Sequence, residues 1–235
     1  MSGRQSGDAD STYTFDDVAV VVGTDSDAEA IGTVLADIAT VTDGRAELIC
    51  VTGSRDGTPD IAQEHGATVV ESDSRATSGV RAAVLASDRP VVVTTDADGS
   101  YPMEWLPDFL AAINDGADVV SGDRRYYGAG GKAGVNRLGN ELLALLAAIA
   151  TGTRVHDATT GLRAYRREVV QKIQWTEDTG LSAELLVRPL MRGYDVRERP
   201  IECDDRTGEA DPDAFGSGAA IATSILKVAV EERLR

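Results

Sequence analysis

Short runs of β-branched and other apolar residues alternate with segments of helical spacing along the first half of the chain. The runs are residues 18–22 (VAVVV), 46–51 (AELICV), 67–70, 90–95 (PVVVTT) and 117–120. The helical segments are residues 28–38, 59–65, 79–86 and 105–113. Apolar runs without polar alternation indicate strands that are buried on both faces, as in parallel sheets. The sequence therefore predicts an α/β fold in which helices cover both faces of a mostly parallel sheet.

The second half of the chain is less regular. Residues 124–134 are rich in Gly, Arg and Tyr and predict a loop, and we expect helices over 136–151, 181–192 and 215–235 and a strand over 194–201. Residues 1–15 are small, polar and acidic, which is typical of a disordered leader, so residues 16–235 would form a single domain. No segment reaches the roughly 18 consecutive apolar residues that a membrane-spanning helix needs.

The chain is strongly acidic and poor in lysine. Asp and Glu total 39 against 23 Lys and Arg, the formal net charge is −16, and the lysines are Lys132, Lys172 and Lys227. Such a chain repels nucleic acid and lacks the basic footprint of proteins that bind it. Acidic, lysine-poor surfaces resemble those of cytoplasmic proteins from salt-loving microbes, in which salt screens the repulsion between carboxylates. We therefore expect a cytoplasmic, halophilic protein with no nucleic-acid partner.

Two carboxylates follow the strand predicted over residues 90–95. Asp96 and Asp98 flank Ala97, and ligands of open α/β sheets collect at the carboxyl ends of strands. Hard oxygen ligands suit Mg²⁺ or Mn²⁺, which also accept phosphate oxygens. The pattern alone is weak evidence for a metal site, because this acidic chain repeats it at residues 8–10, 25–27 and 211–213.

Further motifs accompany the Asp96-Ala97-Asp98 triplet in a fixed order. They are GSRDGT at residues 53–58, GATVV at 66–70, VVSGDR at 119–124, NR at 136–137, DATTGLRA at 157–164, ELLVR at 184–188, RPI at 199–201 and RTGE at 206–209. In this order and spacing the chain resembles the family 2 glycosyltransferases of the GT-A fold, especially the dolichyl- and polyprenyl-phosphate sugar synthases. The resemblance extends over roughly residues 18–210 and implies a Rossmann-like sheet and a nucleotide-sugar donor.

The resemblance also implies roles for individual residues. Asp96 and Asp98 would hold the Mg²⁺ or Mn²⁺ that bridges the donor diphosphate and neutralises the leaving group. The donor pocket would be formed by Thr24, Asp25, Asp27, Thr52, Gly53, Ser54, Asp56, Gly79, Asp96 and Ala97. The set expected to take part in catalysis is Asp98, Arg124, Arg137, Arg163 and Glu184.

The acceptor that the resemblance implies is a dolichyl or polyprenyl phosphate, to which a hexose would pass from a UDP- or GDP-sugar with inversion. A phosphate is anionic near neutral pH and needs charge compensation more than a general base. Arginine supplies two hydrogen bonds from one planar fork. Arg124, Arg137 and Arg163 are the candidates, and each is also explained by a surface ion pair. A lipid acceptor requires peripheral contact with the inner face of the membrane, which the apolar faces of helices 136–151 and 215–235 would allow. Packing of these faces on the core or on another subunit is the alternative.

The chain departs from the family pattern in the half of the pocket that would hold the base and ribose. Val51 and Thr52 stand where the family has paired aspartates, and Thr77-Ser78-Gly79 replaces the usual Gly-Lys-Gly. Asp25 or Asp27 would replace the missing carboxylate in an active enzyme. The alternative is a non-catalytic binding or partner protein with a degraded donor site.

A third hypothesis is a transferase with a hydroxyl acceptor, in which Glu184 or Asp157 would be the base. Either carboxylate would otherwise hold an arginine.

Overall fold

The structure is a computed structural model that describes residues 12–24, 27–72, 77–126, 134–173, 183–203 and 214–235, with the backbone alone for 77–80, 134–137, 183 and 214–217. The strands are β1 (Val18–Thr24), β2 (Glu47–Thr52), β3 (Thr68–Glu71), β4 (Val91–Asp96), β5 (Val119–Asp123), β6 (Arg163–Arg166) and β7 (Val196–Pro200). The helices are η1 (Phe15–Asp17), α1 (Ile31–Val41), α2 (Thr58–Glu64), α3 (Thr77–Ala86), η2 (Met103–Trp105), α4 (Leu106–Asn114), α5 (Gly134–Thr151), α6 (Arg167–Lys172), the π-helix η3 (Ala183–Val187), α7 (Arg188–Met191) and α8 (Ala214–Arg233).

The strands form one seven-stranded sheet in the order β3-β2-β1-β4-β6-β5-β7. β3, β2, β1 and β4 run parallel to one another, and β7 is parallel to β5. β6 lies antiparallel between β4 and β5, with Thr94 opposite Arg163 and Ser121 opposite Arg163. The mostly parallel sheet predicted from the apolar runs is therefore confirmed, and the antiparallel strand β6 is an addition that the sequence reading did not predict.

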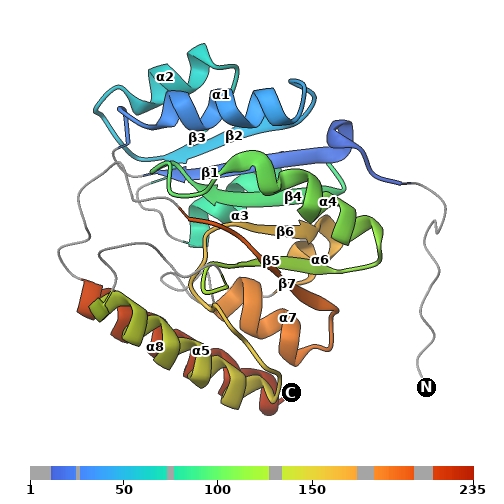
Figure 1. Ribbon diagram of the computed structural model, residues 1–235, viewed down its shortest axis with the longest axis vertical. Coiled ribbons are helices and arrows are strands. Elements are labelled where there is room, and N and C mark those ends of the chain that lie inside the picture. Colours follow the sequence, from blue (N-terminus) through green and yellow to red (C-terminus); the bar gives the residue numbers. More distant parts are fainter. Residues whose placement is uncertain (1–11, 25–26, 73–76, 127–133, 174–182, 204–213) are drawn as a thin grey trace.

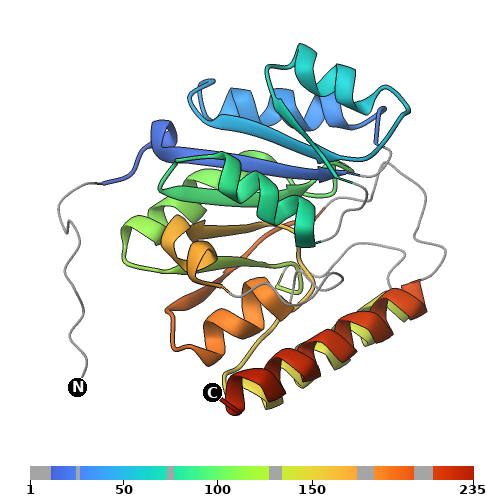
Figure 2. The same ribbon diagram turned by 180° about the vertical axis from the view of Figure 1, so that it is seen from behind.

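Helices cover both faces of this sheet. α1, α2 and α4 pack on one face, where alternate β1 residues such as Val20 and Val22 join Leu35 and Phe109 in one apolar core. The opposite face meets α3 and α6, where Val21 joins a second core (Figures 1 and 2). β1, β2, β4 and β5 each contribute apolar side chains to both cores, which explains the uninterrupted apolar runs.

α5 and α8 form a separate layer beside the sheet. The two helices lie side by side and run in the same direction (Figure 1), and Arg233 near the end of α8 donates to the carbonyl of Ala150 at 3.1 Å. Their inner faces form a third apolar cluster with η3, to which Leu186 and Val187 belong. The continuous helix predicted over residues 181–192 is, in its described part, η3 followed directly by α7. None of the helices in the described part of the chain combines the length and hydropathy needed to span a bilayer.

Candidate active site

The carboxyl ends of β1, β2 and β4 bring three predicted site residues to one edge of the sheet. Thr24 pairs with Thr52 across β1 and β2, and Gly23 pairs with Asp96 across β1 and β4. Both threonines are buried, and the Thr24 hydroxyl donates to Asp27 Oδ2 at 2.6 Å. Asp27 is therefore held at the exit of β1, while Asp25 lies outside the described residues.

The loop after β2 is organised by the Asp56 carboxylate. Its Oδ1 accepts hydrogen bonds from the Ser54 hydroxyl at 2.5 Å, the Thr58 hydroxyl at 2.6 Å and the Thr58 amide at 3.0 Å. The bonds from Ser54 and then Thr58 lower the pKa of Asp56. Gly57 has φ 94°, a left-handed conformation that favours glycine. This loop, which includes Gly53, is a locally determined structure beside the end of β2.

Asp96 and Asp98 lie at the end of β4, in different surroundings. The Asp98 side chain is buried, and its Oδ1 accepts the amide of Ser100 at 3.0 Å and the Ser100 hydroxyl at 2.6 Å. Asp96 is partly exposed, and Ala97 between them is buried and donates its amide to the Gly23 carbonyl at 3.2 Å. Two carboxylates at the end of one strand suit Mg²⁺ or Mn²⁺, which bind through one or two protein carboxylates plus waters and phosphate oxygens.

A fuller protein cage for a metal is not present in the described part of the chain. No group of three or more His, Cys, Asp or Glu side chains is arranged there to hold an ion. In phosphate-transfer sites Mg²⁺ binds one or two protein carboxylates and takes its other ligands from substrate and water. The oxygen donor set of Asp96 and Asp98 therefore fits the predicted ion.

Arg124 is bound to Asp157 by a two-pronged ion pair at the end of β5. Arg124 Nε donates to Oδ2 at 2.6 Å, Nη2 donates to Oδ1 at 2.8 Å, and Nη2 also reaches the Thr159 hydroxyl at 2.7 Å. Burial by itself would raise the pKa of Asp157, but the hydrogen bonds and charge of Arg124 outweigh burial, so this pKa is lowered. Asp157 thus holds an arginine, as one of the two sequence hypotheses for it expected.

The other predicted arginines are placed differently. Arg163 is buried on β6, where Nε donates to the Ser121 hydroxyl at 3.1 Å and Nη2 to the Ala158 carbonyl at 2.9 Å. It therefore supports the loop before β6. The side chain of Arg137, in the first turn of α5, lies outside what the structure describes, and Gly79 lies in the first turn of α3.

Glu184 is fully buried in η3 and is paired with an arginine. Arg188 Nε donates to its Oε2 at 2.5 Å and Nη2 to its Oε1 at 3.2 Å. Arg188, also fully buried, contacts Glu231 at 3.1 Å and Glu232 at 2.5 Å on α8. Of the two roles that the sequence left open for Glu184, the structure thus shows the arginine partner, and Arg188 in turn links this pair to α8.

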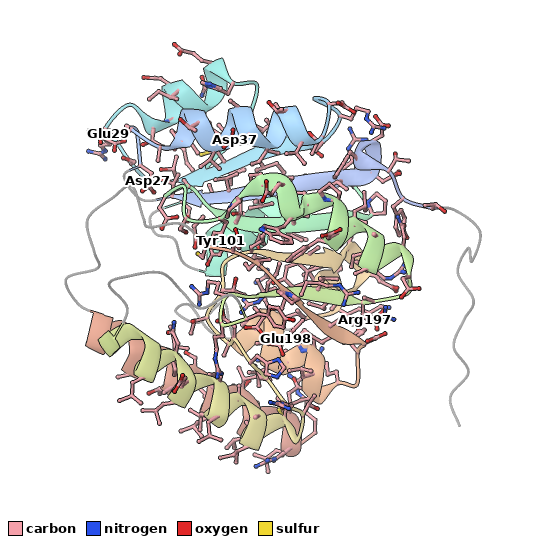
Figure 3. All side chains as sticks on the ribbon, viewed as in Figure 1. Asp27, Glu29, Asp37, Tyr101, Arg197 and Glu198 are labelled. Atoms are coloured by element: carbon pink, nitrogen blue, oxygen red, sulfur yellow. The ribbon has the colours of Figure 1, made fainter. Side chains whose placement is uncertain are left out.

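The sequence reading missed two residues that support this edge of the sheet. Tyr101 is buried, and its hydroxyl accepts the Gly161 amide at 2.8 Å. Glu198 on β7 accepts the amides of His156 at 2.9 Å and Asp157 at 3.0 Å, and contacts His156 Nδ1 at 2.9 Å. In Figure 3, Tyr101 lies between Asp27 and Glu198. The sequence could have indicated Tyr101, because an aromatic residue three positions after Asp98 lies close to the predicted metal ligands. Nothing in the charged strand VRERP distinguishes Glu198 from its neighbours.

Comparison with known proteins matches this chain to a transferase family. The model of glycosyl transferase family 2 matches residues 8–174. A dolichyl-phosphate hexose transferase of Haloferax volcanii is 59% identical over 224 residues, which cover 95% of this chain and 98% of the relative. A polyprenol monophosphomannose synthase of Mycolicibacterium smegmatis is 33% identical and covers 68% of this chain and 66% of its own length.

A solved structure shows the same fold. Glucosyl-3-phosphoglycerate synthase from Mycobacterium tuberculosis, in complex with Mn²⁺, UDP and glucosyl-3-phosphoglycerate, superposes with a TM-score of 0.75 at 19% identity, over 91% of this chain and 80% of that chain. The predicted GT-A fold is therefore confirmed.

Proposed function

The chain belongs to glycosyl transferase family 2 and is a glycosyltransferase, and from this premise we propose that it transfers a hexose from a nucleotide sugar to a dolichyl or polyprenyl phosphate. The observation that carries the proposal is the 59% identity to a dolichyl-phosphate hexose transferase along nearly the full length of both chains. Family membership disfavours the alternative of a non-catalytic binding protein.

Asp96 and Asp98 would hold a Mg²⁺ or Mn²⁺ ion, which neutralises the charge that builds on the departing nucleoside diphosphate. The two residues supply carboxylate oxygens at the end of β4, beside the exits of β1 and β2. Thr24, Asp27, Thr52 and the loop stabilised by Asp56 would then surround the nucleotide. The nucleobase of the donor is either uracil or guanine in this proposal, because Val51 and Thr52 replace the aspartates that the family usually has there.

The transfer itself makes one bond and breaks one. An acceptor phosphate oxygen bonds to the anomeric carbon from the face opposite the leaving group, and the bond from that carbon to the diphosphate oxygen breaks, so the configuration inverts. The acceptor oxygen carries no proton near neutral pH, so no base is required. Glu184 is buried against Arg188, which supports a structural role for it over a role as base and so disfavours a hydroxyl acceptor. Arg124 and Arg137 are the proposed partners of the acceptor phosphate.

The outer face of α5 and α8 supports contact with a membrane that holds the acceptor. Its apolar side chains are each more than half exposed: Leu138, Leu142, Leu145, Ile149, Leu226, Val230 and Leu234. The carboxylates described on these helices, Glu141, Glu231 and Glu232, each contact an arginine. The face thus presents apolar groups without free carboxylates in a chain of charge −16, which suits the interface of a bilayer.

The membrane contact is tested by flotation with phospholipid vesicles in high salt. We expect the wild type to float with the vesicles and Leu142→Glu with Leu145→Glu to remain behind. Leu85→Glu is the matched control, because Leu85 is 55% exposed on α3, away from α5 and α8. If the wild type instead forms dimers without vesicles, and the double variant does not, this face binds a second copy of the chain.

Transfer is tested with radiolabelled UDP- and GDP-hexoses, a polyprenyl phosphate and Mn²⁺ in molar KCl. We expect product only with metal, and a loss of about 100-fold or more for Asp98→Ala, as for removal of one strong transition-state contact. Asp108→Ala, an exposed aspartate on α4, is the control. Equal turnover by wild type and Asp98→Ala would refute the metal site, and transfer to a hydroxyl compound in place of the lipid phosphate would refute the acceptor.

A further inference from the structure

The Asp96 carboxylate is packed directly against the backbone of Gly161, in the loop that leads into β6. A Cβ on residue 161 would collide with Asp96 Oδ2 and lie 2.8 Å from Asp96 Cγ. The three nearest atoms all belong to the Asp96 carboxylate, so contacts this short require the carboxylate or the loop to move. Gly161 therefore limits where the Asp96 carboxylate can lie.

Both polar groups of the Gly161 backbone are in turn fixed by side chains. Its amide donates to the Tyr101 hydroxyl at 2.8 Å, and its carbonyl accepts the Thr94 hydroxyl at 3.0 Å. Thr94 precedes Asp96 by two residues on β4, and Tyr101 follows it by five. The segment that carries Asp96 thus holds Gly161 from both sides, and Gly161 limits the Asp96 side chain.

Tyr101 is suited to this role by its burial and its second contact. The side chain is 4% exposed, and burial raises the pKa of its hydroxyl to about 12, so the phenol stays protonated under all ordinary conditions. Arg124 Nη1 also points at the hydroxyl, at 3.4 Å. One phenol therefore lies between the backbone that supports Asp96 and the arginine that is paired with Asp157.

We propose that Tyr101 is a positioning residue for metal binding, which sets the Asp96 carboxylate through its hydrogen bond to Gly161. The inference rests on the proposed function, because it takes Asp96 as a ligand of Mg²⁺ or Mn²⁺. Groups that orient the ligands of a metal typically change its affinity by 10- to 100-fold when they are removed. The residue itself touches neither substrate nor metal in this account.

The test is Mn²⁺ affinity, measured from the electron paramagnetic resonance signal of free Mn²⁺ in the presence of saturating UDP or GDP. We expect Tyr101→Phe to weaken Mn²⁺ binding about 10-fold and Gly161→Ala to weaken it about 100-fold. Thr94→Val should resemble Tyr101→Phe, and Thr94→Ser, which keeps the hydroxyl, should restore the affinity. Thermal unfolding of each variant checks that the fold is retained.

Two controls separate positioning from a general loss of packing. Tyr13→Phe removes a hydroxyl that Arg166 contacts at 3.4 Å, outside the carboxyl edge of the sheet. Gly32→Ala places a Cβ 3.2 Å from His65 Cε1 and 3.3 Å from Ile61 Cγ2, so it strains the packing of α1 on α2 without touching Asp96 or the loop before β6. Both should leave Mn²⁺ affinity unchanged. If wild type binds Mn²⁺ and Tyr101→Phe binds it equally well, the positioning role is wrong; if wild type binds no Mn²⁺ with either nucleotide, the proposed function itself fails.

Discussion

Arg124 and Asp157 are joined across 33 residues of sequence by hydrogen bonds of 2.6 and 2.8 Å, one to each carboxylate oxygen. The pair connects the exit of β5 to the loop before β6, and only 2% of the Asp157 side chain is exposed. Because two parallel bonds fix a guanidinium in orientation as well as in place, this pair determines which face Arg124 presents to the site.

Asp157→Asn tests that relationship. The amide keeps one acceptor for Arg124 but removes the charge and presents an NH₂ group where the second bond was made. We expect the free energy of unfolding to fall by about 1.5 to 3 kcal/mol, the range for hydrogen bonds to charged groups. Urea unfolding followed by circular dichroism at constant KCl measures the change. Asp115→Asn, at a carboxylate 79% exposed beside Arg197, should cost far less. Equal losses in the two variants would contradict the importance of the buried pair.

Stability should fall steeply at acid pH. The pKa of Glu232 is lowered to about 2, first by its hydrogen bonds from Arg192, and the pKa of Asp157 is lowered as well. A carboxyl whose folded pKa lies below its unfolded pKa stabilises the fold above the unfolded value, and the contribution disappears as pH falls through the folded value. For Glu232 this window runs from the ordinary glutamate pKa of 4.5 down to about 2.

Glu232→Gln removes this contribution, so its stability should change less between pH 5 and pH 3 than that of the wild type. The measurement is the urea midpoint at several pH values between about 5 and 3, an interval that includes the pKa of an unfolded carboxyl group. Parallel pH profiles for the two proteins would contradict the assignment.

Arg188 is more important for folding than Glu184. Glu184→Gln leaves Arg188 with Glu231 and Glu232, whereas Arg188→Met removes the cation that pairs with the fully buried Glu184, while Glu232 keeps Arg192. Breaking a buried pair costs about 3 to 5 kcal/mol when one charge is left uncompensated. We therefore expect Arg188→Met to lose that much or fail to fold, and Glu184→Gln to lose less. Glu184→Gln with normal stability but greatly reduced turnover would show instead that this carboxylate is a base.

Salt should stabilise the protein over an unusually wide range of concentrations. The net charge of −16 with three lysines leaves carboxylates that repel one another, and the Debye length shrinks to about 3 Å at 1 M salt. We expect the thermal midpoint to rise between about 0.1 and 1 M KCl. Scanning calorimetry measures it, and a midpoint that falls over this range would contradict the halophilic interpretation.

The sequence predicted most of the parallel sheet because its strands are continuous apolar runs. It missed β6, since Arg163–Arg166 (RAYR) carries two arginines that no apolar pattern would place beside β4. Arg163 is tolerated there because Ser121 and the Ala158 carbonyl accept its hydrogen bonds. These partners come from tertiary structure, so no local pattern reveals them.

The candidate site was predictable where it depends on topology. Thr24, Thr52 and Asp96 each end a parallel strand, and parallel strands end at one edge. Motif resemblance predicted that Arg163 and Glu184 take part in catalysis, yet both side chains are bound to buried partners. Charge and motif identify such residues but not the full set of their partners, because Arg188, which binds Glu184, meets Glu231 and Glu232 only when α8 packs beside it.

The antiparallel direction of β6 decides from which side the chain reaches the site. β4 and β5 leave the sheet at the carboxyl edge, whereas β6 enters it there, so the loop with Asp157 and Gly161 arrives where Asp96 departs. Had this strand been parallel, the same loop would begin on the opposite rim, roughly 13 Å away for four residues at about 3.3 Å each. The antiparallel direction of β6 thus lets the loop that precedes it lie beside the ends of β4 and β5. Changes in the length of that segment would reshape the pocket without altering any strand that exits beneath it.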